Sequence, residues 1–235
     1  MRFYRSLQPF KLLSFDLDDT LYDNFEVIRN AEATFLAKVR EISGLAQIDS
    51  EYWQYWKQQI FSVNSILYED VTVWRRHTLT ELLKFHGKND QEIDRTLQIA
   101  MAEFMIWRHK ISVPPQHIDI LWKLKQHCIL TIITNGNVDA KKLGLDMFDF
   151  VLRGGEQGRA KPHADLFLKT AAHFHLKMNE ILHVGDNLHT DVQGAIQAGC
   201  QAIWMNFTGK NIMNFNDGRI LPSLEINELS ELLRL

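Results

Sequence analysis

Short apolar runs alternate along the chain with segments of helical periodicity, and this alternation limits the possible folds more than any other feature. The runs have the length of buried strands, and the segments between them repeat apolar residues at helical spacing. The pattern predicts an α/β fold, a doubly wound parallel sheet with helices on both faces. The expected strands are 11–15, 129–134, 149–152, 181–184 and 201–205, and the expected helices carry Ile118 to Leu124, Leu166 to Phe174, and a segment capped by Thr190 and ended by Gly199.

One long stretch, residues 22–112, interrupts this rhythm. It is rich in Glu, Gln, Lys and aromatic residues and reads as several helices without a strand. It far exceeds the few residues that usually join a strand to its helix. Pro114 and Pro115 mark the return to the sheet, because proline disfavours helix at itself and at the preceding residue. We therefore expect an α/β core domain of residues 1–21 and 113–235 and an inserted helical domain of residues 22–112.

Composition excludes several classes of partner. The formal charge is -3, with no long run of either sign, so the chain lacks the basic surface expected of a nucleic-acid binder. No apolar stretch reaches the length of about 20 residues that spans a membrane. The two cysteines, Cys128 and Cys200, lie in stretches that read as core and do not form a disulfide framework. We expect a cytoplasmic protein without a nucleic-acid or membrane partner; the oligomeric state stays open.

Three aspartates, Asp16, Asp18 and Asp19, follow the first predicted strand directly. Bringing several carboxylates to the end of a buried strand is costly unless a cation compensates their charge. Mg²⁺ accepts one or two carboxylates and leaves its other positions to water and phosphate. The segment therefore predicts a site for Mg²⁺ and a phosphoryl group; an acidic turn that caps a helix is the alternative.

Three further polar clusters follow other predicted strands. They are Thr134-Asn135-Gly136, Lys161-Pro162, and Gly185-Asp186 with Asp191. Ligands of open α/β sheets bind beyond the carboxyl ends of the strands, so these loops can converge on one place. Taken singly, Thr134 could bond only its own turn, Lys161 could be solvated, and Asp186 could form a turn. Their joint occurrence at strand ends favours a common site.

Four segments of the chain resemble, in the same order, the four motifs of the haloacid dehalogenase (HAD) superfamily. These segments are FDLDDTLYDN, ITNG, AKP and VGDNLHTD. The resemblance implies a Rossmann-like core and a helical cap, the insert of subgroup I enzymes. It implies that Asp16 attacks phosphorus and becomes an aspartyl phosphate. Asp18 would then protonate the leaving group and later activate water.

The same resemblance assigns the remaining site residues. Thr134 and backbone N–H groups around Asn135 would bind the phosphoryl oxygens, and Lys161 would neutralise their charge. Asp16, Asp186 and the backbone carbonyl of Asp18 would hold Mg²⁺. Asp191 would orient Lys161 or a metal-bound water. Asn187 stands where a number of relatives carry a second aspartate, which predicts a looser metal site.

In the insert, the resemblance places the hinge and the edge of the pocket at Tyr22, Asp23 and Asn24. The candidate substrate contacts are Asn24, Trp74, Arg75 and Arg76, although for the two arginines an ordinary surface position is an equal alternative. Trp53, Trp56 and Ile60 have the i, i+3, i+7 spacing of a helix core rather than of a ligand site. His183 lies in a strand run and is expected to be packed there.

The resemblance implies a phosphatase acting on a small phosphorylated metabolite with Mg²⁺ as cofactor. Several stretches resemble the phosphatases of bacterial riboflavin biosynthesis, among them DVTVWRR, VLRGG and LPSLEI. This likeness implies 5-amino-6-(5-phospho-D-ribitylamino)uracil as substrate, with FMN or sugar phosphates as further substrates. The alternatives are a dehalogenase, a phosphomutase, and a non-catalytic binding module on the same fold.

Overall fold

The computed structural model describes residues 1–63, 65–214 and 220–235 of the chain. These residues form two compact units. A core unit comprises 1–23, 112–136 and 140–235, and a helical unit comprises 24–111 with the short loop 137–139. Each unit has its own hydrophobic core.

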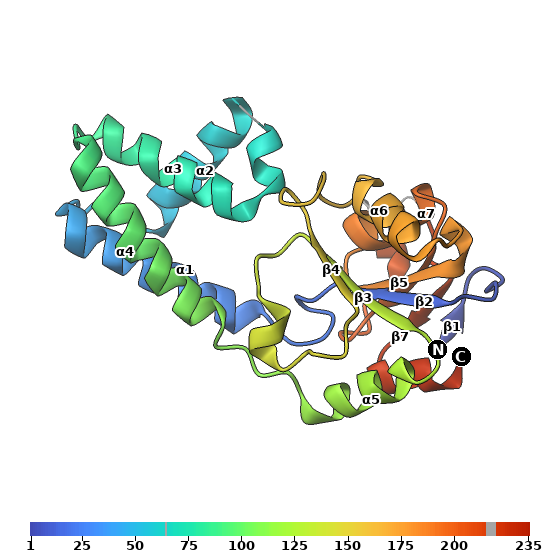
Figure 1. Cartoon of the computed structure of the whole chain (residues 1–235). Coiled ribbons are helices and arrows are strands. Elements are labelled where there is room, and N and C mark those ends of the chain that lie inside the picture. Colours follow the sequence, from blue (N-terminus) through green and yellow to red (C-terminus); the bar gives the residue numbers. More distant parts are fainter. Residues whose placement is uncertain (64, 215–219) are drawn as a thin grey trace. The chain divides into compact units, whose positions relative to one another are not determined.

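The core unit is built on one twisted sheet, coloured from blue to red along the chain in Figure 1. Its strands lie in the order β1-β7-β6-β5-β2-β3-β4. Neighbours from β4 to β7 run parallel, and only β1 pairs antiparallel, with β7. The strands are β1 (Arg2–Phe3), β2 (Leu12–Phe15), β3 (Ile129–Thr134), β4 (Phe150–Arg153), β5 (Ile181–Gly185), β6 (Gln201–Met205) and β7 (Leu224–Ile226). The predicted α/β fold with its parallel sheet is confirmed, and β1 and β7 are additions to the predicted strands.

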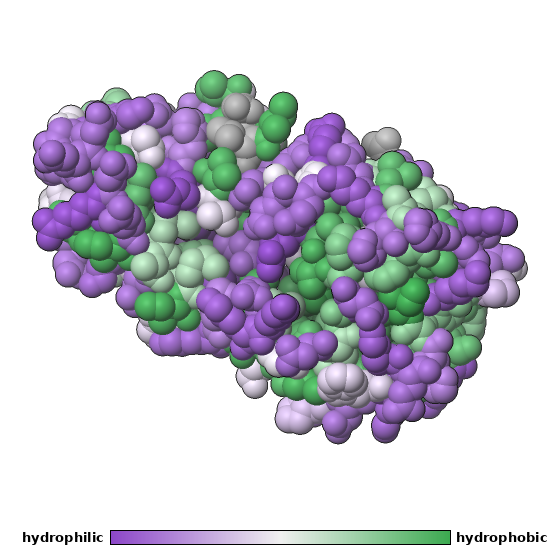
Figure 2. Space-filling view, viewed as in Figure 1, coloured by the Kyte–Doolittle hydropathy of each residue, from purple (hydrophilic) through white to green (hydrophobic). Residues whose placement is uncertain are grey.

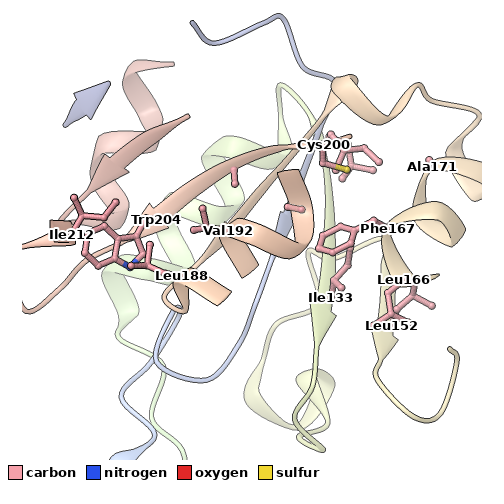
Figure 3. Packing of buried hydrophobic residues seen from close by; sticks show 14 residues of the cluster. Ile133, Leu152, Leu166, Phe167, Ala171, Leu188, Val192, Cys200, Trp204 and Ile212 are labelled. Atoms are coloured by element: carbon pink, nitrogen blue, oxygen red, sulfur yellow. The ribbon is translucent and has the colours of Figure 1, made fainter. Parts of the chain in front are cut away.

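Helices cover both faces of this sheet. In Figure 1, α6 (Asp165–Phe174) and α7 (Gly194–Gln197) lie on one side and α5 (Pro115–Lys125) lies on the other. Figure 3 shows Phe167 of α6 beside Ile133 of β3, while Trp204 of β6 lies with Leu188 and Ile212 in another part of the same hydrophobic cluster. Short helical segments complete the unit: η2 (Ala140–Leu143), η3 (Met178–Glu180), the π-helical η4 (Leu188–Gln193), η5 (Ile212–Asn214) and η6 (Leu229–Arg234).

The helical segment after β5 begins with a different cap residue from the predicted one. Its cap is Asn187, whose side-chain oxygen accepts hydrogen bonds from the backbone N–H groups of His189 and Thr190. The prediction of Thr190 as the cap is therefore wrong, because Thr190 already lies within the first turn. At the other end Gly199 has φ +94°, a left-handed conformation that suits glycine.

The helical unit contains four α-helices and one short 3₁₀ segment within its described residues. They are α1 (Phe25–Ser43), α2 (Ser50–Val63), η1 (Ser65–Glu69), α3 (Val71–Phe85) and α4 (Asp90–Arg108). Helices α1 and α4 lie side by side (Figure 1) and enclose Phe35 and Phe104, which pack edge to face. Trp53 is fully buried, as its helical spacing predicted, whereas Trp56 and Ile60 are half-buried.

Polar side chains cap the N-termini of α3 and α4. The Asp70 carboxylate accepts the N–H groups of Thr72 and Val73 at the start of α3. At the start of α4, Asn89 and Glu92 form a reciprocal capping box.

On the face shown in Figure 2, hydrophilic residues cover most of both units, and hydrophobic residues gather in smaller groups. Among the described residues, no helix is both long and apolar enough to cross a bilayer.

Candidate active site

Asp16 is the first residue after β2, a strand buried along its whole length. The Asp16 N–H donates to the carbonyl of Val184 on β5, so the backbone is held in the sheet while the carboxylate extends past its edge. Only 15% of the Asp16 side chain is exposed. Burial raises the pKa of Asp16 to about 6; Lys161 opposes this shift, and Asp191 and Asp18 add to it.

Asp18 lies in the tight turn that follows. The Asp19 N–H donates to the carbonyl of Tyr22 and closes this turn, with Asp19 at φ +57°. The buried Tyr22 hydroxyl donates to Asp18 Oδ1 at 2.8 Å. Thus Asp18 lies beside Asp16 with one carboxylate oxygen fixed by a phenol.

Lys161 brings a positive charge to this edge of the sheet. Its Nζ lies 3.0 Å from Asp16 Oδ1 and 2.6 Å from Asp191 Oδ1, and it donates to the carbonyl of Ile133 at 2.7 Å. Although burial alone would favour the neutral amine, the Asp16 and Asp191 carboxylates raise the pKa of Lys161. Lys161 is 3% exposed and remains charged between two anions, so the solvated-lysine alternative is wrong.

Asp191 is completely buried and has donors on both carboxylate oxygens. Oδ1 pairs with Lys161 and lies 3.4 Å from His183 Nε2, and Oδ2 accepts the N–H of Asn187 at 3.0 Å. Burial acts to raise its pKa, but the Lys161 ammonium and His183 hold the pKa of Asp191 well below its usual range. Gly185 allows this approach, because a Cβ there would lie 2.3 Å from Asp191 Cγ.

Asp186, just after β5, completes an acidic cluster. One oxygen each from Asp16, Asp186 and Asp191 lies within 4.8 Å of the other two. Burial raises the pKa of Asp186 to about 8, and the carboxylates of Asp191, Asp16 and Asp19 add to this shift. The Trp204 indole N–H fixes the Asp186 carbonyl at 2.8 Å, and Thr20 lies 3.5 Å from the Asp186 carboxylate.

The charges of this cluster test whether a divalent cation fits. Among the described residues, this cluster combines three carboxylates with the Lys161 ammonium, and burial with the neighbouring carboxylates raises the pKa of Asp186, so a further positive charge would stabilise the ionised cluster. Hard divalent cations prefer carboxylate oxygens. The residues therefore fit such an ion, and Asp16 and Asp186 could hold it, since both oxygens of Asp191 already have donors.

The loop after β3 contributes Thr134 and Asn135. Thr134 Oγ1 accepts the N–H of Gly136 at 3.0 Å, as the turn alternative expected, yet the hydroxyl hydrogen can still donate to another group. Asn135 joins this loop to Lys161 through two bonds, from Asn135 Nδ2 to the Lys161 carbonyl and from the Lys161 N–H to Asn135 Oδ1, each 2.9 Å long. Asn135 thus positions Lys161 as well as the loop.

The side chains of the remaining predicted site residues make other contacts. Asn187 is exposed and its side-chain oxygen caps η4. Asn24, Trp74 and Arg75 belong to the helical unit. Arg75 is 8% exposed, pairs with Glu32 at 3.2 Å and stacks on the ring of Phe104. Its contacts lie inside that unit, so the surface-arginine alternative is wrong for Arg75, whereas Arg76 is exposed.

Two contributions to the site are not evident from the sequence. The Tyr22 hydroxyl reaches Asp18, and the His183 ring reaches Asp191. Neither the position of Tyr22 in LYDN nor that of His183 in ILHV indicates these contacts. They depend on the turn after β2 and on the register of β5.

A family profile described as haloacid dehalogenase-like hydrolase matches residues 10–199, which is more than half of the chain. The chain belongs to this family. Among curated members, it is 40% identical over 237 aligned residues to the 5-amino-6-(5-phospho-D-ribitylamino)uracil phosphatase YigB of Escherichia coli K12, with 100% of both chains covered. It is 25% identical to the glyceraldehyde 3-phosphate phosphatase of Pyrococcus furiosus, covering 97% of this chain and 94% of that one.

Solved structures of haloacid dehalogenase-like proteins share the architecture. The crystal structure of a 2-haloacid dehalogenase from Pseudomonas syringae pv. tomato DC3000 superposes with a TM-score of 0.85 at 32% identity, covering 96% of this chain and 97% of that one. The family therefore includes relatives named for phosphatase and for dehalogenase chemistry, and the site residues must distinguish the two.

Proposed function

We propose that this haloacid dehalogenase-like hydrolase is a Mg²⁺-dependent phosphatase that forms an aspartyl phosphate on Asp16. The observation that supports the proposal most is the buried arrangement of Asp16, Lys161 and Asp186 at the end of the sheet. It combines a carboxylate nucleophile, a fixed cation and a site suited to a hard metal ion. Phosphoryl transfer needs these groups because its catalysis is mainly positioning and charge stabilisation.

The nucleophile is held ready by its neighbours. Lys161 lies 3.0 Å from Asp16 Oδ1 and favours the ionised carboxylate, which is the attacking form. The same ammonium neutralises charge on the transferring phosphoryl oxygens. The Thr134 hydroxyl and the N–H groups near Asn135 donate to those oxygens.

Asp18 acts as general acid and base. An alkoxide is a poor leaving group, so a nearby carboxylic acid that protonates it accelerates cleavage. The resulting carboxylate then accepts a proton from the water that hydrolyses the aspartyl phosphate. The Tyr22 hydroxyl, which donates to Asp18 Oδ1 at 2.8 Å, orients this carboxyl group for the proton transfer.

Asp16, Asp186 and the backbone carbonyl of Asp18 are the proposed Mg²⁺ ligands. The bound ion would supply positive charge that stabilises the phosphoryl group during transfer. Asp191 stays outside this set and holds Lys161.

For the substrate, we propose 5-amino-6-(5-phospho-D-ribitylamino)uracil. The support is the full-length similarity to YigB, at 40% identity. We further propose that the helical unit, as the cap of this family, selects the substrate. Asn24 and Trp74 are its candidate contact residues, and FMN and sugar phosphates are candidate further substrates.

The direct test is phosphate release from a panel of phosphomonoesters with Mg²⁺, with EDTA, and with Mg²⁺ restored. The panel includes the ribitylaminouracil phosphate, glyceraldehyde 3-phosphate and FMN. We expect the first to give the highest kcat/KM, and we expect Asp16→Asn to abolish turnover in a folded protein. Activity that persists in metal-free buffer, or in the Asp16→Asn enzyme, would refute the mechanism.

Dehalogenation is the second candidate, because a structural relative at 32% identity is a 2-haloacid dehalogenase. That chemistry also uses an aspartate nucleophile, but its halide leaving group needs no proton and the reaction needs no Mg²⁺. Asp18, oriented by Tyr22, and the raised pKa of Asp186 favour the phosphatase. Halide release from 2-chloropropionate without metal would favour the dehalogenase instead.

A further inference from the structure

A line of polar side chains crosses the apolar core of the sheet. Ser14 on β2 pairs in register with Thr131 on β3 and with His183 on β5, and all three residues are 0% exposed. Buried hydroxyl and imidazole groups are costly unless they are hydrogen-bonded. Ser14 and His183 satisfy each other, with Ser14 Oγ 2.9 Å from His183 Nδ1.

The position of the His183 proton follows from its two neighbours. Asp191 Oδ1, 3.4 Å from Nε2, is a carboxylate oxygen and can only accept. An unprotonated Nε2 would also be an acceptor, and its lone pair would repel that oxygen. Nε2 therefore carries the hydrogen. Burial lowers the pKa of His183 to about 4, so the ring is neutral and Nδ1 is an acceptor. The Ser14 hydroxyl therefore donates to Nδ1 and selects this tautomer.

The line continues into the catalytic site. His183 meets the same Asp191 oxygen, Oδ1, that lies 2.6 Å from Lys161 Nζ, and Lys161 meets Asp16. A neutral donor restrains Asp191 without cancelling its charge, so that the carboxylate keeps its attraction for Lys161. A charged His183 ring would instead compete with Lys161 for the Asp191 carboxylate.

We propose that His183 is a positioning residue of the catalytic site, with Ser14 fixing its tautomer, and that it acts through Asp191 on Lys161. The proposal rests on the proposed function of Lys161. His183 also packs edge to face against Phe167, with ring centroids 5.1 Å apart. Packing alone would need only the ring, whereas positioning needs the Nε2 hydrogen.

The first test is the tautomer of the wild-type protein at neutral pH, read by long-range ¹H–¹⁵N NMR. The signals of His183 are identified by their loss in His183→Gln or, should that variant not fold, by their shift in Ser14→Ala. We expect protonated Nε2 and unprotonated Nδ1. A proton on Nδ1, or a charged ring, would overturn the proposal whether or not the enzyme is active. Absence of phosphatase activity in the wild type would instead refute the proposed function.

The second test compares His183→Phe, which keeps a ring but no donor, with His183→Gln, which keeps an N–H. Loss of a partner behind a catalytic group typically costs about 10–100-fold in activity, and we expect a fall in kcat of that size for His183→Phe with little change in KM. Gln should restore most of the loss. A folded His183→Phe enzyme with wild-type kcat would contradict the positioning role.

Thr131→Val is the matched control. It removes a buried hydroxyl from the same row of the sheet, and Thr131 Oγ1 has no hydrogen-bond partner. We expect its kcat to equal that of the wild type. An equal fall in kcat for Thr131→Val and His183→Phe would show a general disturbance of the sheet and would overturn the specific role of His183.

Discussion

Asp16 and Asp18 are separated by one residue but have different surroundings. Asp16 pairs with the Lys161 ammonium, whereas Asp18 accepts a hydrogen bond from a neutral phenol. A nucleophile must be ionised to attack, and a general acid must hold a proton. The contrast between the two partners matches this division of roles.

Replacing Asp18 should therefore affect the two halves of the reaction differently. With an alkyl phosphate, Asp18→Asn loses the acid for a poor leaving group, and such proton-transfer catalysis is typically worth about 10²–10⁴-fold. With p-nitrophenyl phosphate the leaving group departs unaided, but hydrolysis of the aspartyl phosphate still lacks its base. We expect a rapid-mixing trace to show a burst of nitrophenol near one per active site and then a slow phase. Slow release without a burst would show that Asp18 acts mainly in the first step.

Tyr22→Phe is a milder test of the same assignment. It removes the hydroxyl that fixes Asp18 Oδ1 and keeps the buried ring. We expect kcat for an alkyl phosphate to fall by up to about tenfold, because one hydrogen bond to a charged group is worth roughly 1.5–3 kcal/mol and the carboxylate can partly reorient. The rate of the first step with p-nitrophenyl phosphate, read from nitrophenol release in rapid mixing, should stay nearly unchanged. Equal losses with both substrates would point to a distorted turn instead.

At the level of elements, the sequence is most informative where a strand is buried on both faces. The apolar runs predicted β2 to β6, whereas β1 and β7, with two and three residues, are too short to show a period. Asp16 and Asp186, which directly follow parallel strands, lie close together as the strand-end argument predicted, whereas Lys161 reaches Asp16 from the long loop after β4. The contacts of Ser14, His183 and Tyr22 depend on register and turn geometry, which a single sequence does not reveal.

The helical unit allows a stability test at one helix end. Asn89→Ala breaks the capping box of α4 and leaves backbone N–H groups of the first turn unpaired. Loss of such a cap typically costs about 0.5–2 kcal/mol. We expect a lower urea midpoint by circular dichroism. Asp94→Ala, at an exposed position later in the same helix, should change stability by less than about 0.5 kcal/mol. Equal effects of both substitutions on the urea midpoint would mean that the capping box does not stabilise the protein.

For the molecule as a whole, the acidic cluster links metal binding, pH and stability. Burial and neighbouring carboxylates raise the pKa of Asp186 from its ordinary 3.8 to about 8. The folded protein therefore binds more protons than the unfolded chain between these two pH values. Stability of the metal-free protein consequently falls, through this group, as pH rises across that window.

A cation should reverse this loss, because it binds the ionised form of Asp186. Binding displaces about one proton, so Mg²⁺ affinity should rise by up to about tenfold per pH unit between pH 6 and 8. Ligand binding to the folded state raises its stability. We therefore expect the increase in Tm on adding a fixed concentration of Mg²⁺ to be larger at pH 8 than at pH 6, measured by thermal unfolding with EDTA as reference. Asp186→Asn should lose most of the Mg²⁺ effect and its pH dependence together. An increase in Tm that is the same at both pH values would contradict the assignment of Asp186 as a ligand that titrates in this range.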